Sequence, residues 1–115
     1  MKLLHKIITG LIIALGCLHI GFTPFNYGRF NIDAMWFVGT GFALILAGFL
    51  NVAVIRTADR VVRALGVITN VSFALLFGVA LFQMAQPQVF IGMALFGAAG
   101  VCALFKRTGS QKDSP

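Results

Sequence analysis

The chain has 115 residues, of which 59% are hydrophobic and only 10% are charged, and it contains no glutamate. Soluble domains carry about a quarter charged residues, so this composition excludes a water-soluble globular domain and is typical of an integral membrane protein. The net charge of +6 does not indicate nucleic-acid binding, because the basic residues lie in short clusters between long apolar runs.

Four apolar segments are long enough to cross a bilayer, which takes about 20 residues of helix. In chain order they cover residues 4–22, 34–55, 64–84 and 88–105. The breaks are polar or end helices: Thr23-Pro24, residues 56–63, and the tight turn Gln86-Pro87-Gln88. We therefore expect an all-α integral membrane protein whose single domain, residues 1–105, is an antiparallel bundle of four transmembrane helices.

The basic residues orient this bundle. One side carries Arg29 alone, and the other carries the remaining eight of the nine: Lys2, Lys6, Arg56, Arg60, Arg63, Lys106, Arg107 and Lys112. Positive residues accumulate on the cytoplasmic side, so both termini should lie there, with residues 106–115 as a polar tail. A cleaved signal peptide in place of the first span would leave a less balanced topology. The pattern predicts a multi-pass protein of the bacterial inner membrane.

Small residues recur every four positions in the second and third spans, and each series contains one asparagine. The first series is Gly39, Ala43, Ala47 and Asn51, and the second is Gly66, Asn70, Ala74 and Gly78. This spacing keeps each series on one side of its helix, where small residues let helices approach closely in lipid. Antiparallel neighbours would place the two asparagines at similar depth. We expect their amides to pair as a structural clasp rather than to serve transport.

His19 lies inside the first apolar span, shortly before Pro24. An ionisable residue within a span is a candidate functional residue. The polar or aromatic residues expected near it at the outer mouth are Thr23, Asn26, Tyr27, Arg29, Asp33, Trp36, Thr40 and Gln83. Together with His19 they would line a shallow pocket open to the outside, with Trp36 in the headgroup layer. The alternative is that His19 only anchors the end of its helix.

The other histidine, His5, is expected at the cytoplasmic interface beside Lys2 and Lys6, facing anionic headgroups. It lies fourteen residues before His19 on the same helix, about 21 Å along the axis, so one haem could not be held by both. The methionines show no MxxM or HxxxM spacing, which argues against copper. Cys17 and Cys102 form no CxxC pair and lie toward opposite faces. We therefore expect neither a cofactor nor a metal.

The stretch LHIGFTPFN, followed by MWFVGTGFALILAGFLN, resembles small four-span bacterial inner-membrane proteins of the DoxX-like type. The resemblance covers the span pattern along the whole chain, and it implies a type of protein rather than an activity. Small multidrug transporters are similar in size and span count. Their coupling carboxylate in the first span has no counterpart here.

We expect a non-catalytic accessory or ligand-binding protein with an outward-facing polar pocket around His19. Its expected partners are the lipid bilayer, a small lipophilic ligand, and a second copy or another membrane protein. Two alternatives stay open: a small oligomeric transporter or channel, which needs a continuous polar path, and a membrane redox protein that uses His19 with a quinone or haem. An enzyme would need a second catalytic group, for which Asp33 is the candidate.

Overall fold

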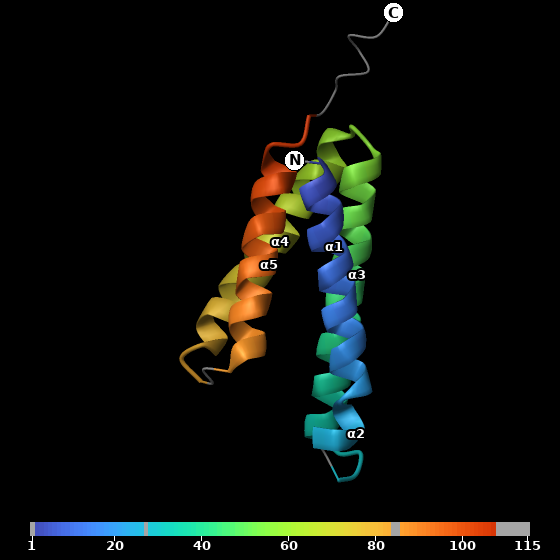
Figure 1. The fold of residues 1–115 in the computed structure, drawn as a ribbon, viewed down its shortest axis with the longest axis vertical. Coiled ribbons are helices and arrows are strands. Elements are labelled where there is room, and N and C mark those ends of the chain that lie inside the picture. Colours follow the sequence, from blue (N-terminus) through green and yellow to red (C-terminus); the bar gives the residue numbers. More distant parts are fainter. Residues whose placement is uncertain (1, 27, 84–85, 108–115) are drawn as a thin grey trace, which may run out of the picture.

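The computed structural model describes residues 2–26, 28–83 and 86–107, and of Phe25 and Asn26 it describes the backbone alone. Throughout these residues the regular structure is helical (Figure 1). The helices are α1 (Lys2–Gly21), the short α2 (Thr23–Asn26), α3 (Ile32–Arg56), α4 (Arg60–Ala80) and α5 (Pro87–Leu104). In the described part of the chain, four of them are long and apolar enough to cross a membrane. This confirms the prediction of an all-α protein with four candidate spans.

Capping side chains explain where two of the long helices begin. The Asn31 side chain accepts a hydrogen bond at 2.9 Å from the backbone N–H three residues later, and α3 follows directly. Asp59 likewise accepts from two backbone N–H groups in the first turn of α4. Such caps satisfy N–H groups that have no partner inside the helix. As a result α4 begins at Arg60, before the predicted start at Ala64. It ends at Ala80, before the predicted end at Met84, and Met84 lies outside the described residues.

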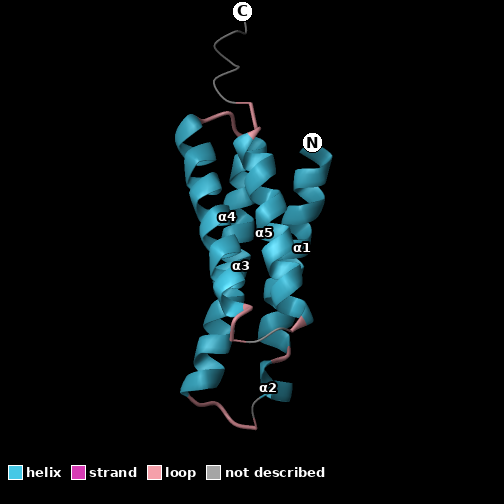
Figure 2. Ribbon diagram, turned by 90° about the vertical axis from the view of Figure 1, so that its left-hand side faces the viewer, coloured by secondary structure: helices cyan, strands magenta, loops and turns pink. Residues whose placement is uncertain are grey.

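The four long helices form two pairs. α1 packs mainly along α3, and α4 packs mainly along α5. The pairs meet at the end where α1 begins and α5 ends, and they separate toward the end that carries α2, where α1 and α3 extend beyond α4 and α5 (Figure 1). The view in Figure 2 shows the same extension, with α2 at its tip. We call the end that holds Lys2, Arg56 and Lys106 the basic end, and the opposite end the α2 end.

Glycines set the close approach of α1 and α3. A Cβ atom added to Gly16 would lie 2.8 Å from the carbonyl oxygen of Gly41 and 2.8 Å from Cγ1 of Ile45. A Cβ atom added to Gly41 would lie 2.9 Å from the carbonyl oxygen of Gly16. The two backbones are therefore in direct contact, which is how helices associate in lipid when apolar burial does not select a partner.

The buried face of α3 differs in part from the predicted series of small residues. Ala47 and Asn51 are buried, but Ala43 is only partly buried, and Gly39 is exposed with no atom within 4 Å of its Cβ position. The face that packs on α1 runs instead through Gly41 and Gly48. A step of four residues advances about 40° beyond a full turn, so after three steps the series has left the contact face.

The core lies where the two helix pairs meet. Ile12, Leu44 and Phe96 are fully buried there. Two rings of α4, Phe73 and Phe77, stack on Phe96 with ring centroids 4.6 and 5.9 Å away. Because these side chains come from all four long helices, this apolar layer spans the full width of the bundle.

Two basic side chains donate hydrogen bonds to carbonyl groups at the C-terminal ends of helices at the basic end. Nζ of Lys106, which follows α5, donates to the carbonyl oxygen of Ile55 in α3 at 2.8 Å. Nη1 of Arg63 in α4 donates to the carbonyl oxygen of Leu104 in α5 at 2.7 Å. Carbonyl groups in the last turn of a helix lack internal partners and carry partial negative charge, so both contacts are favourable. The Lys106 contact joins the two helix pairs.

Replacing Gly16 with alanine should destabilise the protein, because the new methyl group meets a backbone oxygen that cannot move without separating α1 from α3. We expect a loss of about 1–3 kcal/mol, the usual cost of overpacking. The measurement is thermal unfolding of the detergent-solubilised protein, followed by circular dichroism.

Gly10→Ala is the matched control on the same helix, since no atom lies within 4 Å of its Cβ position. Alanine is favoured over glycine inside a helix by roughly 1 kcal/mol, so this variant should be neutral or slightly more stable. Equal unfolding midpoints for the two variants would contradict the packing described for Gly16.

Candidate functional site

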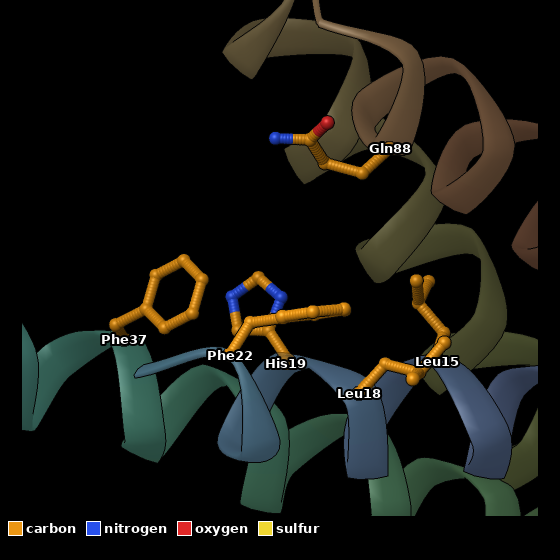
Figure 3. Close-up of a pocket in the computed structure, with 6 residues that line it drawn as sticks. All are labelled: Leu15, Leu18, His19, Phe22, Phe37 and Gln88. Atoms are coloured by element: carbon orange, nitrogen blue, oxygen red, sulfur yellow. The ribbon is translucent and has the colours of Figure 1, made fainter. Parts of the chain in front are cut away.

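A cavity of about 350 Å³ lies between the α1–α3 pair and α5, on the α2 side of the apolar core (Figure 3). Its wall consists of Leu15, Leu18, His19, Phe22, Phe37 and Gln88. Four of these side chains are apolar. The two polar ones come from different helix pairs, His19 from α1 and Gln88 from α5. The cavity thus combines a mostly apolar wall with hydrogen-bonding groups on two sides.

The imidazole of His19 is held in place on one face. It stacks on the ring of Phe37, with ring centroids 3.8 Å apart and an angle of 15° between the planes. The hydroxyl of Thr23 donates to the backbone carbonyl of His19 at 3.1 Å, which ties the start of α2 to the end of α1. Ring and backbone are therefore both positioned, and the imidazole projects toward the α5 side of the cavity (Figure 3).

Gln88 borders the cavity from the other side. It is the second residue of α5, directly after Pro87. Its Nε2 atom donates to Oε1 of Gln86, the residue that precedes the helix. This contact orients the Gln88 amide near the helix start, so the α5 wall of the cavity also ends in a positioned polar group (Figure 3).

Of the nine predicted pocket residues, the structure places His19 in the cavity wall and Thr23 against the His19 backbone. Five others are exposed and do not line the cavity: Arg29, Asp33, Trp36, Thr40 and Gln83. The Thr40 hydroxyl donates to the carbonyl oxygen of Trp36 within α3. Tyr27 and the side chain of Asn26 lie outside the described residues. The cavity lies between helices, because α1 and α3 extend past α5 and carry the loop residues away from it.

Five of the six cavity residues are absent from the sequence-based prediction: Leu15, Leu18, Phe22, Phe37 and Gln88. Gln88 has a usable signal, since it is an amide at the start of the fourth span and on the same side of the membrane as His19 in the predicted topology. Because Gln88 belongs to the predicted tight turn, it is not among the predicted pocket residues. Phe37 has no such signal, because the chain contains twelve phenylalanines and only packing distinguishes this one.

A second polar group is buried near the basic end. The amides of Asn51 and Asn70 exchange two hydrogen bonds, with Nδ2 of each donating to Oδ1 of the other at 2.9 and 2.8 Å. This is the pairing that their similar depth predicts. Nδ2 of Asn51 also donates to the carbonyl oxygen of Ala47 at 2.9 Å, and Oδ1 of Asn51 lies 2.9 Å from Nε2 of His5. Hydrogen bonds of the Asn51 amide therefore connect three helices: α1, α3 and α4.

The prediction that His5 faces anionic headgroups beside Lys2 and Lys6 is wrong. Its side chain is only 2% exposed, whereas both lysines are exposed, because His5 is on the inward face of α1 and finds a partner in Asn51. The chemistry also assigns its tautomer. The Ala47 carbonyl can only accept, so it fixes the Asn51 nitrogen, and the Asn51 oxygen must face His5. Nε2 of His5 therefore carries the proton and donates.

An apolar layer separates the cavity from this polar group. Ile8 and Ile12 lie between His5 and His19 along α1, Leu44 lies between Phe37 and Asn51 along α3, and Phe96 occupies the matching region of α5. Thr9, also buried there, has a hydroxyl with no hydrogen-bond partner among the described residues. Within the described part of the chain the cavity thus ends at packed apolar side chains.

No group of three or more His, Cys, Asp or Glu side chains that could hold a metal occurs among the described residues. The chain matches no protein-family model, no curated protein and no solved structure. The chemistry of the cavity itself suits a ligand with a large apolar surface and a few polar atoms, since such ligands occupy apolar pockets with a small number of orienting polar groups.

Replacing Asn51 and Asn70 with leucine, singly and together, should give non-additive losses of stability. Each single variant removes both hydrogen bonds between the two amides and leaves a donor and an acceptor of the remaining amide without that partner, so the double variant should lose less than the sum, by about 0.6–1.7 kcal/mol. Asn51→Leu should cost more than Asn70→Leu, because it also removes the partner of His5. The free energy of unfolding in mixed micelles is the quantity to measure.

Asn51→Leu combined with Thr40→Val supplies the control. Thr40 is exposed and bonds only within its own helix, so these two changes should add. Additivity in the asparagine pair as well would contradict a direct contact between the two amides.

Proposed function

We propose that this chain is a small, DoxX-like protein of the bacterial inner membrane that holds a lipophilic ligand in the His19 cavity and has no catalytic activity of its own. Its helices would form an antiparallel bundle with the basic end, and both termini, in the cytoplasm. The charge distribution supports this orientation, because Lys2, Arg56, Arg60 and Lys106 all gather at one end. The cavity then lies toward the outer leaflet.

The observation that carries the proposal is the make-up of the cavity wall. A volume of about 350 Å³ lies within the roughly 300–1,000 Å³ typical of small-molecule sites. Leu15, Leu18 and Phe22 offer an apolar surface, while His19 and Gln88 offer hydrogen bonds. The ligand class that fits has an apolar body against α1 and one polar head that reaches the imidazole or the amide.

The apolar layer favours binding over transport. A transporter needs polar groups from one side of the membrane to the other, whereas Ile12, Leu44 and Phe96 are fully buried between the cavity and the asparagine pair. Acid–base catalysis is not supported either. Among the described residues, His19 is the one ionisable side chain in the cavity wall, and Asp33, its candidate partner, is exposed and outside that wall.

Native mass spectrometry of protein released from mild detergent tests the proposal with His19→Phe. A phenylalanine keeps a ring to stack on Phe37 but removes both ring nitrogens, so it separates hydrogen bonding to a ligand from support of the helix end. We expect the wild type to carry a bound small molecule, and the variant to retain about tenfold less of it, the loss of one hydrogen bond.

Thr40→Val is the matched control, because Thr40 is an exposed polar residue three positions after Phe37 on α3 and does not line the cavity. It should retain the ligand as well as the wild type does. Spectra without a bound small molecule, or with the same occupancy in all three proteins, would contradict the proposal and leave His19 as a helix-end anchor.

A further inference from the structure

A separate cavity of about 250 Å³ lies at the basic end. Three of its lining side chains are cationic: Lys2 from the first turn of α1, and Lys106 and Arg107 from the segment that follows α5. The rest of the wall is formed by His5, Ile55, Cys102 and Phe105. The cavity therefore joins the start of α1, the end of α3 and the end of α5, and the opposite ends of the chain both contribute positive charge to it.

No carboxylate among the described residues compensates this charge. Among the residues that the structure describes, the wall of the cavity contains no acidic side chain. Asp33 lies in the first turn of α3 at the α2 end, and the carboxylate of Asp59 accepts from the first turn of α4. Asp113 lies outside the described residues. No carboxylate in the described structure therefore offsets the Coulomb repulsion among the three cations.

Lys106 is positioned for a further contact. Its Nζ atom donates to the Ile55 carbonyl at 2.8 Å, which holds the ammonium at the cavity wall. Because an ammonium carries more than one donor, it can bind a second acceptor from this position. Burial lowers the pKa of Lys106, and the positive charge of Lys2 lowers it further. An anion between these two groups would reverse the second effect and favour the charged form.

We propose that this cavity binds a phosphate group, held by Lys2, Lys106 and Arg107. A guanidinium pairs with two phosphate oxygens at once, and the two ammonium groups supply point charges around the others. The phosphate would belong to an anionic phospholipid or to a soluble phosphate ester. The site lies at the ends of membrane-spanning helices, which is the depth of lipid headgroups, and Ile55 and Phe105 give it an apolar side.

The test uses the full chain in a non-ionic detergent and native mass spectrometry. Wild-type protein, Lys2→Gln/Arg107→Gln and Arg56→Gln/Arg60→Gln are each titrated with phosphatidylglycerol and with phosphatidylcholine of the same acyl chains. Both double variants lose two positive charges at the same end, but only the first pair lines the cavity. Lys106 is left unchanged because it also closes α3.

We expect the wild type to bind phosphatidylglycerol more tightly than phosphatidylcholine. Lys2→Gln/Arg107→Gln should weaken phosphatidylglycerol binding about thirtyfold, since each basic residue near an anionic headgroup contributes roughly fivefold. Arg56→Gln/Arg60→Gln should weaken it less than about threefold. Lys2 and Arg107 are exposed and their removal relieves repulsion among the three cations, so the thermal midpoint without lipid should not fall. Arg107→Gln alone, with about a fivefold effect, gives a second and milder test.

Equal binding of the two lipids, or equal losses in the two double variants, would overturn the proposal and leave only non-specific surface charge. Glycerol 3-phosphate and inorganic phosphate, added without lipid, distinguish the source of the phosphate. If they raise the thermal midpoint of the wild type but not of Lys2→Gln/Arg107→Gln, the site accepts a soluble phosphate compound. If only phosphatidylglycerol does so, the site requires a lipid.

Discussion

The amide of Asn51 is the contact on which the arrangement of the helices depends. Lipid is as apolar as the helix surfaces, so apolar burial gives α3 no preferred partner. Asn51 uses its hydrogen-bonding capacity in full, toward Ala47, Asn70 and His5. An unpaired polar group in the hydrocarbon region is costly, so arrangements that separate α1, α3 and α4 at this depth are disfavoured. Register near the basic end follows from this single side chain.

The opening that forms the His19 cavity follows from where such contacts occur. Within each helix pair, glycines allow direct contact: Gly16 meets Gly41 between α1 and α3, and Gly92 lies under the ring of Phe77 between α5 and α4. Between the pairs, the polar contacts lie near the basic end. Toward the α2 end the pairs separate (Figure 1), and the space between them is bordered by one imidazole and one amide.

The apolar layer gives the two ends of the molecule different chemistry. On the α2 side, the cavity is mostly apolar, with one imidazole and one amide as hydrogen-bonding groups. On the basic side, three cationic side chains line the cavity. Ile12, Leu44 and Phe96 are fully buried and separate the two cavities. A lipophilic ligand on one side and a phosphate group on the other can therefore be tested independently, because substitutions at one end do not touch the wall of the other.

The sequence alone determined the four apolar helices, their approximate limits and the pairing of Asn51 with Asn70, because length, hydropathy and depth are local properties of each segment. The tertiary structure decided which face of each helix points inward. Lipid-facing and protein-facing side chains are equally apolar, so hydrophobic periodicity does not separate Gly39, which is exposed, from Gly41, which packs on α1. The burial of His5 and the place of Phe37 and Gln88 in the cavity wall also depend on the tertiary structure, because the residues that they meet lie far away in the chain.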